Sequence, residues 1–268
     1  MIRVAIHGVP RSGTSWLGAI FDSSPNVCFK NQPLFSYKLK GYLNERSTKE
    51  KINRFFSLLE KTTDSFMDQV EGKSKGTIPL FEKKDLTHIV YKEARYHNIL
   101  PNLMQEDEDI KVIGIVRNPK SVLSSWYHAP KEFNQKAWSF VDEWENAQHK
   151  NLGKIEEFYG YNKWKEVLLL FLDLKSKYPK RFFLIKYSDL LFETENMVRD
   201  LFEFCELNYT TSTELFIKKS KSTDLANDAY SVYRANQFDD KWKDFLSKSI
   251  VNKIDNDIHE SGLAEFNQ

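Results

Sequence analysis

A short β-type run followed at once by a glycine-spaced turn constrains the fold of this chain more than any other feature. The run Ile2-Arg3-Val4-Ala5-Ile6 leads to Gly8 and then to Gly13, and an apparent helix continues to about Ser23. Glycines at this spacing let backbone N–H groups close around an anion, and the N-terminus of the next helix adds partial positive charge. The chain is therefore expected to begin with a strand, an anion-binding turn and a helix.

Three further β-rich runs alternate with helical patterns. They span His88 to Tyr91, Val112 to Val116 and Phe182 to Tyr187. The run from Val112 to Val116 is apolar throughout, which is typical of a strand buried on both faces of a parallel sheet. Helices are predicted where apolar residues recur at helical spacing: Met197, Val198, Leu201, Phe202 and Cys205, then Trp242, Phe245, Leu246, Ile254 and Ile258. This alternation predicts an α/β fold of three layers, α/β/α, with a mostly parallel central sheet, whose ligands lie beyond the carboxyl ends of the strands.

Composition limits where such a domain acts. No repeat or linker divides the 268 residues, so we expect a single domain over residues 1–268. The 39 Lys and Arg against 38 Asp and Glu argue against nucleic acid as a partner and against polybasic membrane binding. The longest apolar run, Val167 to Leu172, is too short for a transmembrane segment. With two cysteines and no signal pattern after Met1, we expect a cytoplasmic protein.

The glycine-spaced turn has the spacing of a P-loop but lacks its lysine. Thr14 follows Gly13 where a nucleoside triphosphatase has Lys, and the cation of this turn is Arg11. The strand ending at Val116 runs into Arg117, without the acidic residue that holds Mg²⁺ in triphosphatases. No metal-ligand spacing occurs either. The turn is thus predicted to bind an anion without a metal.

A second basic turn follows the strand that ends at Val116. Arg117 stands at the strand's carboxyl end, Pro119 suits the first position of a new helix, and Ser125 comes eight residues after Arg117. A guanidinium and a hydroxyl near a helix start form a second anion site. Together the two turns predict a ligand with two separated anionic groups.

These motifs resemble those of the sulfotransferases that use 3'-phosphoadenosine 5'-phosphosulfate (PAPS). Residues 10–16, PRSGTSW, are similar to the family's 5'-phosphosulfate loop, PKSGTTW, and Arg117 to Ser125 is similar to its 3'-phosphate motif. Phe183 to Leu190 resembles a strand ending in Tyr-Glu-Asp, whose Tyr contacts adenine. Tyr233-Arg234, followed by Lys241 to Lys243, resembles the region that adds another Arg to the 3'-phosphate.

The resemblance implies PAPS as the donor, 3'-phosphoadenosine 5'-phosphate (PAP) as a product, and no required metal. Arg11 stands where the family has a lysine that stabilises the bridging oxygen, and its role is electrostatic because a guanidinium does not donate a proton. Thr14 and Ser15, with the loop amides, are implied at the 5'-phosphate. The implied cofactor-binding residues are Arg11, Ser12, Gly13, Thr14, Ser15, Trp16, Arg117, Ser125, Tyr187 and Arg234.

The base that removes the acceptor's proton is implied less directly. The small-molecule branch of the family has Lys-Thr-His where this chain has Lys92-Glu93-Ala94. Glu93 is then the nearest base, as in the glycan and protein-tyrosine branches, and Lys92 is implied at the leaving phosphate. His97 and His128 are alternative bases. In a purely structural role, Glu93 would instead be a surface carboxylate or an ion-pair partner.

The acceptor is expected to be a hydroxylated molecule, either a glycan or a small molecule, on the basis of Arg11 and the Lys92-Glu93 pair. Residues 30–84 and 128–154 match no motif and are expected to be helical insertions on the acceptor side. Two other functions stay open. One is a degenerate P-loop kinase or triphosphatase, which Mg²⁺-dependent ATP binding would support. The other is a non-catalytic nucleotide-binding protein.

Overall fold

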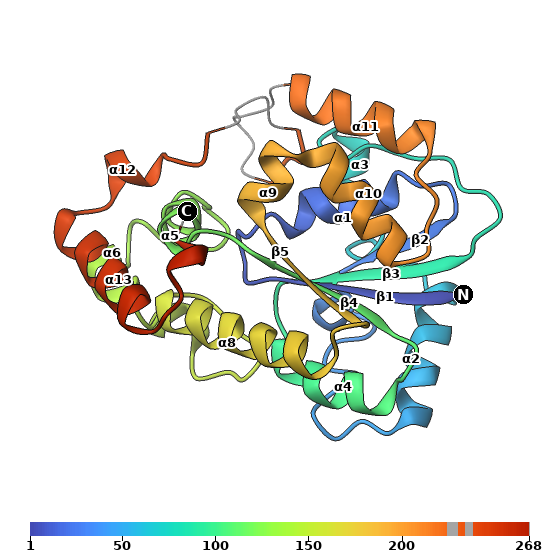
Figure 1. Ribbon diagram of the computed structural model, residues 1–268, viewed down its shortest axis with the longest axis horizontal. Coiled ribbons are helices and arrows are strands. Elements are labelled where there is room, and N and C mark those ends of the chain that lie inside the picture. The colour runs from blue at the N-terminus through green and yellow to red at the C-terminus, as the bar shows by residue number, and fades with distance from the viewer. Residues whose placement is uncertain (224–229, 234–237, 268) are drawn as a thin grey trace.

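A parallel sheet forms the centre of the computed structural model, which describes residues 1–223, 230–233 and 238–267 (Figure 1). Within these residues the sheet has five strands in the order β2-β3-β1-β4-β5, and every pairing is parallel. The strands are β1 (Ile2–His7), β2 (Val27–Asn31), β3 (His88–Glu93), β4 (Lys111–Val116) and β5 (Phe182–Lys186). The four predicted strands are confirmed, although the fourth ends one residue early because Tyr187 begins a helix.

Strand β2 was not predicted, because its sequence does not look like that of a buried strand. Lys30 is buried within it, and its ammonium donates to the carbonyl of Thr62 at 2.8 Å and to Asp68 at 2.7 Å. A buried lysine is tolerated when such partners compensate for lost hydration. Those partners are distant in sequence, so the run of residues 27–31 alone does not indicate a strand.

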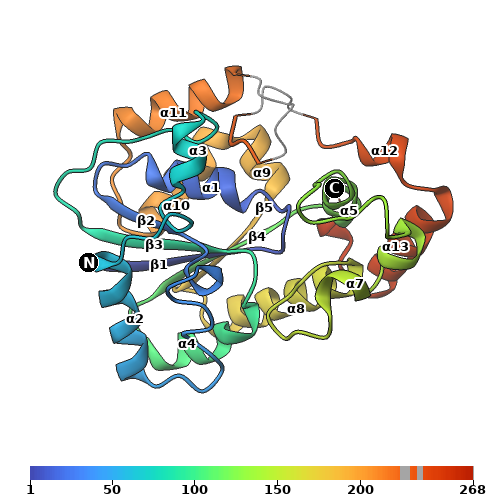
Figure 2. The same cartoon turned by 180° about the vertical axis from the view of Figure 1, so that it is seen from behind.

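Helices cover both faces of the sheet, which confirms the three-layer prediction (Figures 1 and 2). One face carries α1 (Thr14–Asp22), α3 (Val70–Ser74), α9 (Tyr187–Phe192), α10 (Thr194–Phe204) and α11 (Thr211–Ser222). The other carries α2 (Lys49–Lys61), α4 (Leu100–Glu106) and α8 (Tyr161–Lys177). Alternate residues of the strands feed two cores: Val4 and Ile6 pack on the α1 face, and Ala5 packs on the opposite face.

The remaining elements lie beyond the carboxyl ends of the strands or beside them (Figure 1). They are α5 (Pro119–Tyr127), α6 (Phe140–Glu143), α7 (Gln148–Asn151), α12 (Trp242–Phe245) and α13 (Lys248–Glu260), with the 3-10 turns η1 (Pro33–Phe35), η2 (His97–Ile99) and η3 (Ala264–Phe266). Helix α5 begins as predicted: Pro119 is its first residue, and the side chain of Asn118 accepts from the backbone N–H of Lys120. The apolar spacing from Trp242 to Ile258 belongs to two helices rather than one, because Ser247 caps α13.

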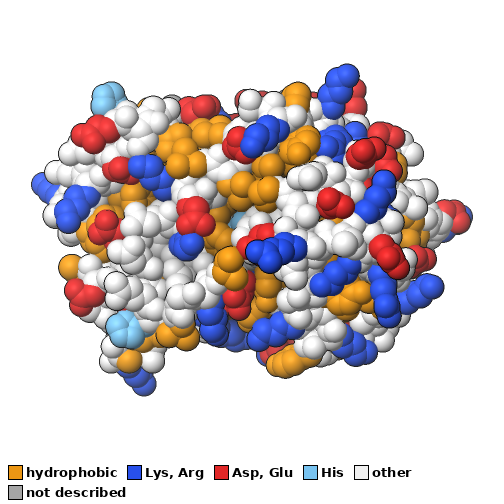
Figure 3. Space-filling view, turned by 90° about the horizontal axis from the view of Figure 1, so that it is seen from below, with side chains coloured by type: hydrophobic (Ala, Val, Ile, Leu, Met, Phe, Trp, Pro, Cys, Tyr) orange, Lys and Arg blue, Asp and Glu red, His pale blue; other side chains and the backbone are white. Residues whose placement is uncertain are grey.

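On the face seen in Figure 3, positive and negative side chains are interspersed with hydrophobic ones. Among the described residues, no helix combines the length and the apolar character needed to cross a bilayer.

Candidate active site

The β1–α1 turn requires glycine at both predicted positions. Gly13 has φ of 90°, and a Cβ there would lie 2.5 Å from the ring of Tyr187. A Cβ at Gly8 would lie 2.6 Å from the carbonyl oxygen of Ile115 on the neighbouring strand. Bare backbone therefore closes the turn at the N-terminus of α1, where unpaired N–H groups favour an anion. Thr14 is buried there and Ser15 is exposed.

Arg11 has a left-handed backbone conformation, with φ of 73°, which is strained for a residue with a side chain. Its Nε donates to Ser125 Oγ at 3.0 Å, and its Nη1 lies 3.7 Å from Glu132 Oε1. The guanidinium also lies 5.6 Å from the centroid of the Tyr230 ring. The structure thus joins two predicted site residues, Arg11 and Ser125, from two separate elements.

Arg117 joins the two basic turns. Its Nη1 donates to the backbone carbonyl of Arg11 at 2.7 Å. Its Nε donates to both carboxylate oxygens of Asp239, at 3.2 and 3.0 Å, and its Nη2 donates to Asp239 Oδ1 at 2.5 Å. Ser121 Oγ donates to the carbonyl of Asp239 at 2.9 Å. Sequence reasoning missed Asp239, a carboxylate that occupies the hydrogen-bonding edge of the arginine.

The two predicted adenine contacts lie together beside these turns. The rings of Trp16 and Tyr187 are 6.3 Å apart between centroids and nearly perpendicular. Tyr187 also places its ring 4.8 Å from the guanidinium carbon of Arg117. Trp16 Nε1 donates to Ser220 Oγ at 3.0 Å. The predicted residue Arg234 lies outside the described residues.

Lys92 and Glu93 end β3 on opposite faces of the sheet, and both are buried. Burial lowers the pKa of Lys92 to about 8. Glu93 Oε1 accepts from the backbone N–H of Leu34 in η1 at 2.7 Å, whereas Oε2 is buried without a partner among the described residues. Burial raises the pKa of Glu93 to about 8. The description of Glu93 as a surface carboxylate is therefore wrong, since its exposed fraction is 0%.

The two alternative bases have very different surroundings. His97 is fully buried, with its Nδ1 3.1 Å from His7 Nδ1, and burial lowers its pKa well below the ordinary value. Its ring packs at 4.6 Å on Phe158. His128 is exposed, and its Nδ1 lies 2.8 Å from the carbonyl of Ser124, to which it donates. Neither imidazole has the setting of a base held ready in an active site.

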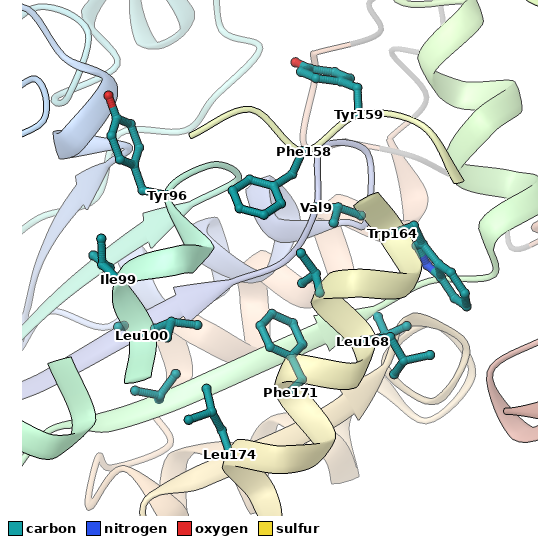
Figure 4. Close-up of a cluster of buried hydrophobic side chains, with 14 of the residues drawn as sticks. Val9, Tyr96, Ile99, Leu100, Phe158, Tyr159, Trp164, Leu168, Phe171 and Leu174 are labelled. Carbon is teal, nitrogen blue, oxygen red and sulfur yellow. The ribbon is translucent and has the colours of Figure 1, made fainter. Parts of the chain in front are cut away.

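A polar cluster at the same end of the sheet was also missed from the sequence. Arg95 donates to Glu157 Oε2 and to the hydroxyl of Tyr159, each at 2.9 Å, and to Gln32 Oε1 at 3.2 Å. Its guanidinium stacks 4.1 Å from the ring of Phe35. Figure 4 shows Phe158 and Tyr159, from the segment before α8, beside Val9 of the β1–α1 turn. This cluster fixes the segment before α8 beside the carboxyl ends of β2 and β3.

Comparisons with known proteins agree with this geometry. A family model described as "Sulfotransferase domain" matches residues 2–266. Mouse sulfotransferase SULT7A1 complexed with PAP is 14% identical, with a TM-score of 0.58 over 99% of this chain and 89% of that chain. Retinol dehydratase in complex with androsterone and PAP is 14% identical, with a TM-score of 0.54 over 97% of this chain and 80% of that chain.

A further similar structure is the sulfotransferase domain of the Synechococcus PCC 7002 olefin synthase. It is 14% identical, with a TM-score of 0.53 over 96% of this chain and 93% of that chain. No curated protein matches the chain. At such identities the structural likeness concerns the fold, and it agrees with the predicted three-layer α/β architecture.

Proposed function

The chain belongs to the sulfotransferase domain family, and we propose that it transfers a sulfuryl group from PAPS to a hydroxyl or amine of an acceptor. The observation that carries this proposal is the meeting of the two basic turns, where Arg117 donates to the carbonyl of Arg11 at 2.7 Å. Two joined anion-binding turns suit one ligand with two anionic groups. Because the chain belongs to this family, sulfuryl transfer is preferred to the alternative function of a degenerate P-loop kinase or triphosphatase.

The residues present fit PAPS. Ser12 Oγ is buried in the β1–α1 turn without a partner among the described residues, and Gly13 turns the backbone into α1 with φ of 90°. PAPS supplies an activated sulfuryl group on its 5'-phosphate. We infer that the amides and hydroxyls from Ser12 to Ser15 hold that 5'-phosphate, while Trp16 and Tyr187 contact the adenine. PAP complexes of two structures with the same fold support this inference.

Arg11 is proposed to stabilise the negative charge that develops on the bridging oxygen as the bond to sulfur breaks. A guanidinium does not donate a proton in proteins, so this contribution is electrostatic. A single well-placed donor of this kind contributes roughly 10²–10³-fold to the rate. The sulfuryl group carries less negative charge than a terminal phosphoryl group, so fixed donors and a cation suffice for its transfer.

Arg117 is proposed to bind the 3'-phosphate, together with Ser125 and Arg234. In this structure Arg117 donates three hydrogen bonds to Asp239. A phosphate that binds the same edge of the guanidinium must displace this carboxylate. The 3'-phosphate therefore exchanges one charged partner of Arg117 for another.

Lys92 is proposed to contact the leaving phosphate, and Glu93 as the proton acceptor stays a prediction from the sequence. Burial raises the pKa of Glu93 to about 8, so most of these carboxyls carry a proton at pH 7. Its Oε1 is also bonded to η1. A rate that depends on ionised Glu93 would rise with pH through about 8.

For the acceptor we propose a hydroxylated molecule, a glycan or a small molecule, which residues 30–84 and 128–154 enclose. Phe35 and the segment that holds Glu132 support this placement, because both lie near the carboxyl ends of the strands.

We also propose a cytoplasmic location, which the two free cysteines, Cys28 and Cys205, support.

Conversion of PAPS to PAP with a panel of sugars, phenols and alcohols tests the proposed function. Arg11→Ala should lose roughly 10²-fold in turnover, and it should also bind PAP more weakly, because the bridging oxygen is a charged 5'-phosphate oxygen in PAP. Exposed Arg199→Ala on α10 is the matched control and should keep the wild-type rate. An Arg11→Ala protein as active as the wild type would contradict the role of Arg11, and a wild type that makes no PAP would contradict the function.

A further inference from the structure

Glu132 is a carboxylate beside Arg11 that the sequence motifs do not mark. It lies just after α5, and the backbone fixes its position. Its N–H donates to the carbonyl of Ala129 at 2.8 Å, and its own carbonyl accepts from Trp126 Nε1 at 3.2 Å. Trp126 is fully buried, so this part of the chain is anchored to the core rather than free on the surface.

The two carboxylate oxygens of Glu132 differ. Oε1 lies 3.7 Å from Arg11 Nη1, which is an ion-pair distance but longer than a hydrogen bond. Oε2 is buried and has no partner among the described residues. A carboxylate kept only for stability would satisfy both oxygens, since a buried charged atom without a partner is costly. Oε2 is therefore a charged acceptor that no donor among the described residues satisfies.

Cations surround this carboxylate. Burial lowers the pKa of Lys92 and of Lys150, and the negative charge of Glu132 offsets part of that effect at both lysines. Arg11 is in ion-pair contact, and the charge of Glu132 also acts on Arg95 and the hydroxyl of Tyr159. Glu132 thus contacts the β1–α1 turn through Arg11, and its charge acts on residues of β3 and of the segment before α8.

The other candidate bases are less well placed at neutral pH. Glu93 Oε2 is also without a partner among the described residues, but Glu93 is 0% exposed whereas the side chain of Glu132 is 19% exposed. The other oxygen of Glu93 accepts from the N–H of Leu34. His97 is enclosed in the core against His7. His128 donates to a helix carbonyl. Among these groups, Glu132 is the one in contact with Arg11, the residue proposed to act at the sulfuryl group.

We propose that Glu132 receives the acceptor's proton during sulfuryl transfer, an inference that rests on the function proposed above. The acceptor O–H bond breaks and its proton passes to the Glu132 carboxylate. The acceptor oxygen forms the new bond to sulfur, and the bond from sulfur to the bridging oxygen breaks with its electron pair leaving on PAP. Before PAPS binds, the negative charge of Glu132 neutralises the positive charge of Arg11. Once Arg11 interacts with the bound donor, protonation of Glu132 removes the electrostatic repulsion between its carboxylate and the donor.

Hydrolysis of PAPS, in which water replaces the acceptor, tests this role without knowledge of the natural acceptor. Glu132→Gln should lower the rate of PAP formation roughly 10²-fold at saturating PAPS and leave PAP affinity equal or tighter. Exposed Glu203→Gln on α10, with the same loss of charge outside the proposed site, is the matched control and should match the wild type. Added formate should restore part of the lost rate to Glu132→Ala, an effect that a structural role would not produce.

Other results would contradict the assignment of Glu132 or the function on which it rests. A Glu132→Gln protein that hydrolyses PAPS at the wild-type rate would overturn the proposal. A loss of rate in this variant that is matched by a loss of PAP affinity would also overturn it. A large loss in Glu93→Gln beside an active Glu132→Gln would return the base to Glu93. A wild type that neither binds PAP nor hydrolyses PAPS would refute the proposed function itself, and the Glu132 assignment with it.

Discussion

Replacing Asp239 with Asn should strengthen the binding of PAP. Asp239 accepts three hydrogen bonds from Arg117, at 2.5 to 3.2 Å, and its side chain is 22% exposed while that of Arg117 is 18% exposed. The phosphate must break this pair. Asn keeps the shape and one neutral acceptor oxygen but removes the charge. A partly exposed ion pair is worth about 1 kcal/mol at most, so the expected gain is about fivefold in affinity.

Calorimetric titration with PAP and with AMP measures this effect. AMP lacks the 3'-phosphate, so its affinity should be the same for Asp239→Asn and the wild type. Asp240→Asn is the matched control, since it removes the same charge from the next residue, whose ion pair with Lys243 is long at 3.9 Å and exposed. If both variants bind PAP as the wild type does, Arg117 keeps Asp239 in the complex and the 3'-phosphate binds elsewhere.

Two further predictions concern Arg117 and Glu93. Arg117→Ala should weaken PAP binding by about 2 kcal/mol or more, because a phosphate would lose a charged hydrogen-bonding partner, and calorimetry showing unchanged PAP affinity would refute this. Burial raises the pKa of Glu93 to about 8, so between about pH 4.5 and 8 the folded protein keeps a proton that the unfolded chain has lost, and folding stability falls as pH rises. Glu93→Gln should therefore gain stability relative to the wild type between pH 5 and pH 8 in urea melts, and a constant difference would contradict the buried, protonated state.

Local sequence patterns predict the framework of this site well. The turn from Gly8 to Gly13 is fixed by backbone sterics, since a Cβ at either glycine would collide with Ile115 or Tyr187. The strand before it and the helix after it follow from short-range apolar periodicity. Arg117 is located by the same logic, because it directly follows an apolar strand and precedes a proline at a helix start.

Contacts distant in sequence could not be predicted in this way. Asp239 is 122 residues from Arg117 in the sequence. Arg11 and Glu132 are also far apart in the sequence, and they come into contact only because the folded chain places the segment after α5 beside the β1–α1 turn. No periodicity links such pairs. The buried setting of Glu93 was also missed, because it includes a hydrogen bond from the N–H of Leu34, which the unpredicted strand β2 and the turn after it bring to the end of β3.

The central claim is that the two basic turns form one site for a nucleotide with phosphates at both its 3' and 5' positions. Calorimetric binding of PAP, compared with AMP and with ATP plus Mg²⁺, tests it most directly. We predict tight binding of PAP that does not need a metal and that weakens strongly when the 3'-phosphate is missing. Equal binding of PAP and AMP, or a preference for ATP with Mg²⁺, would contradict the account.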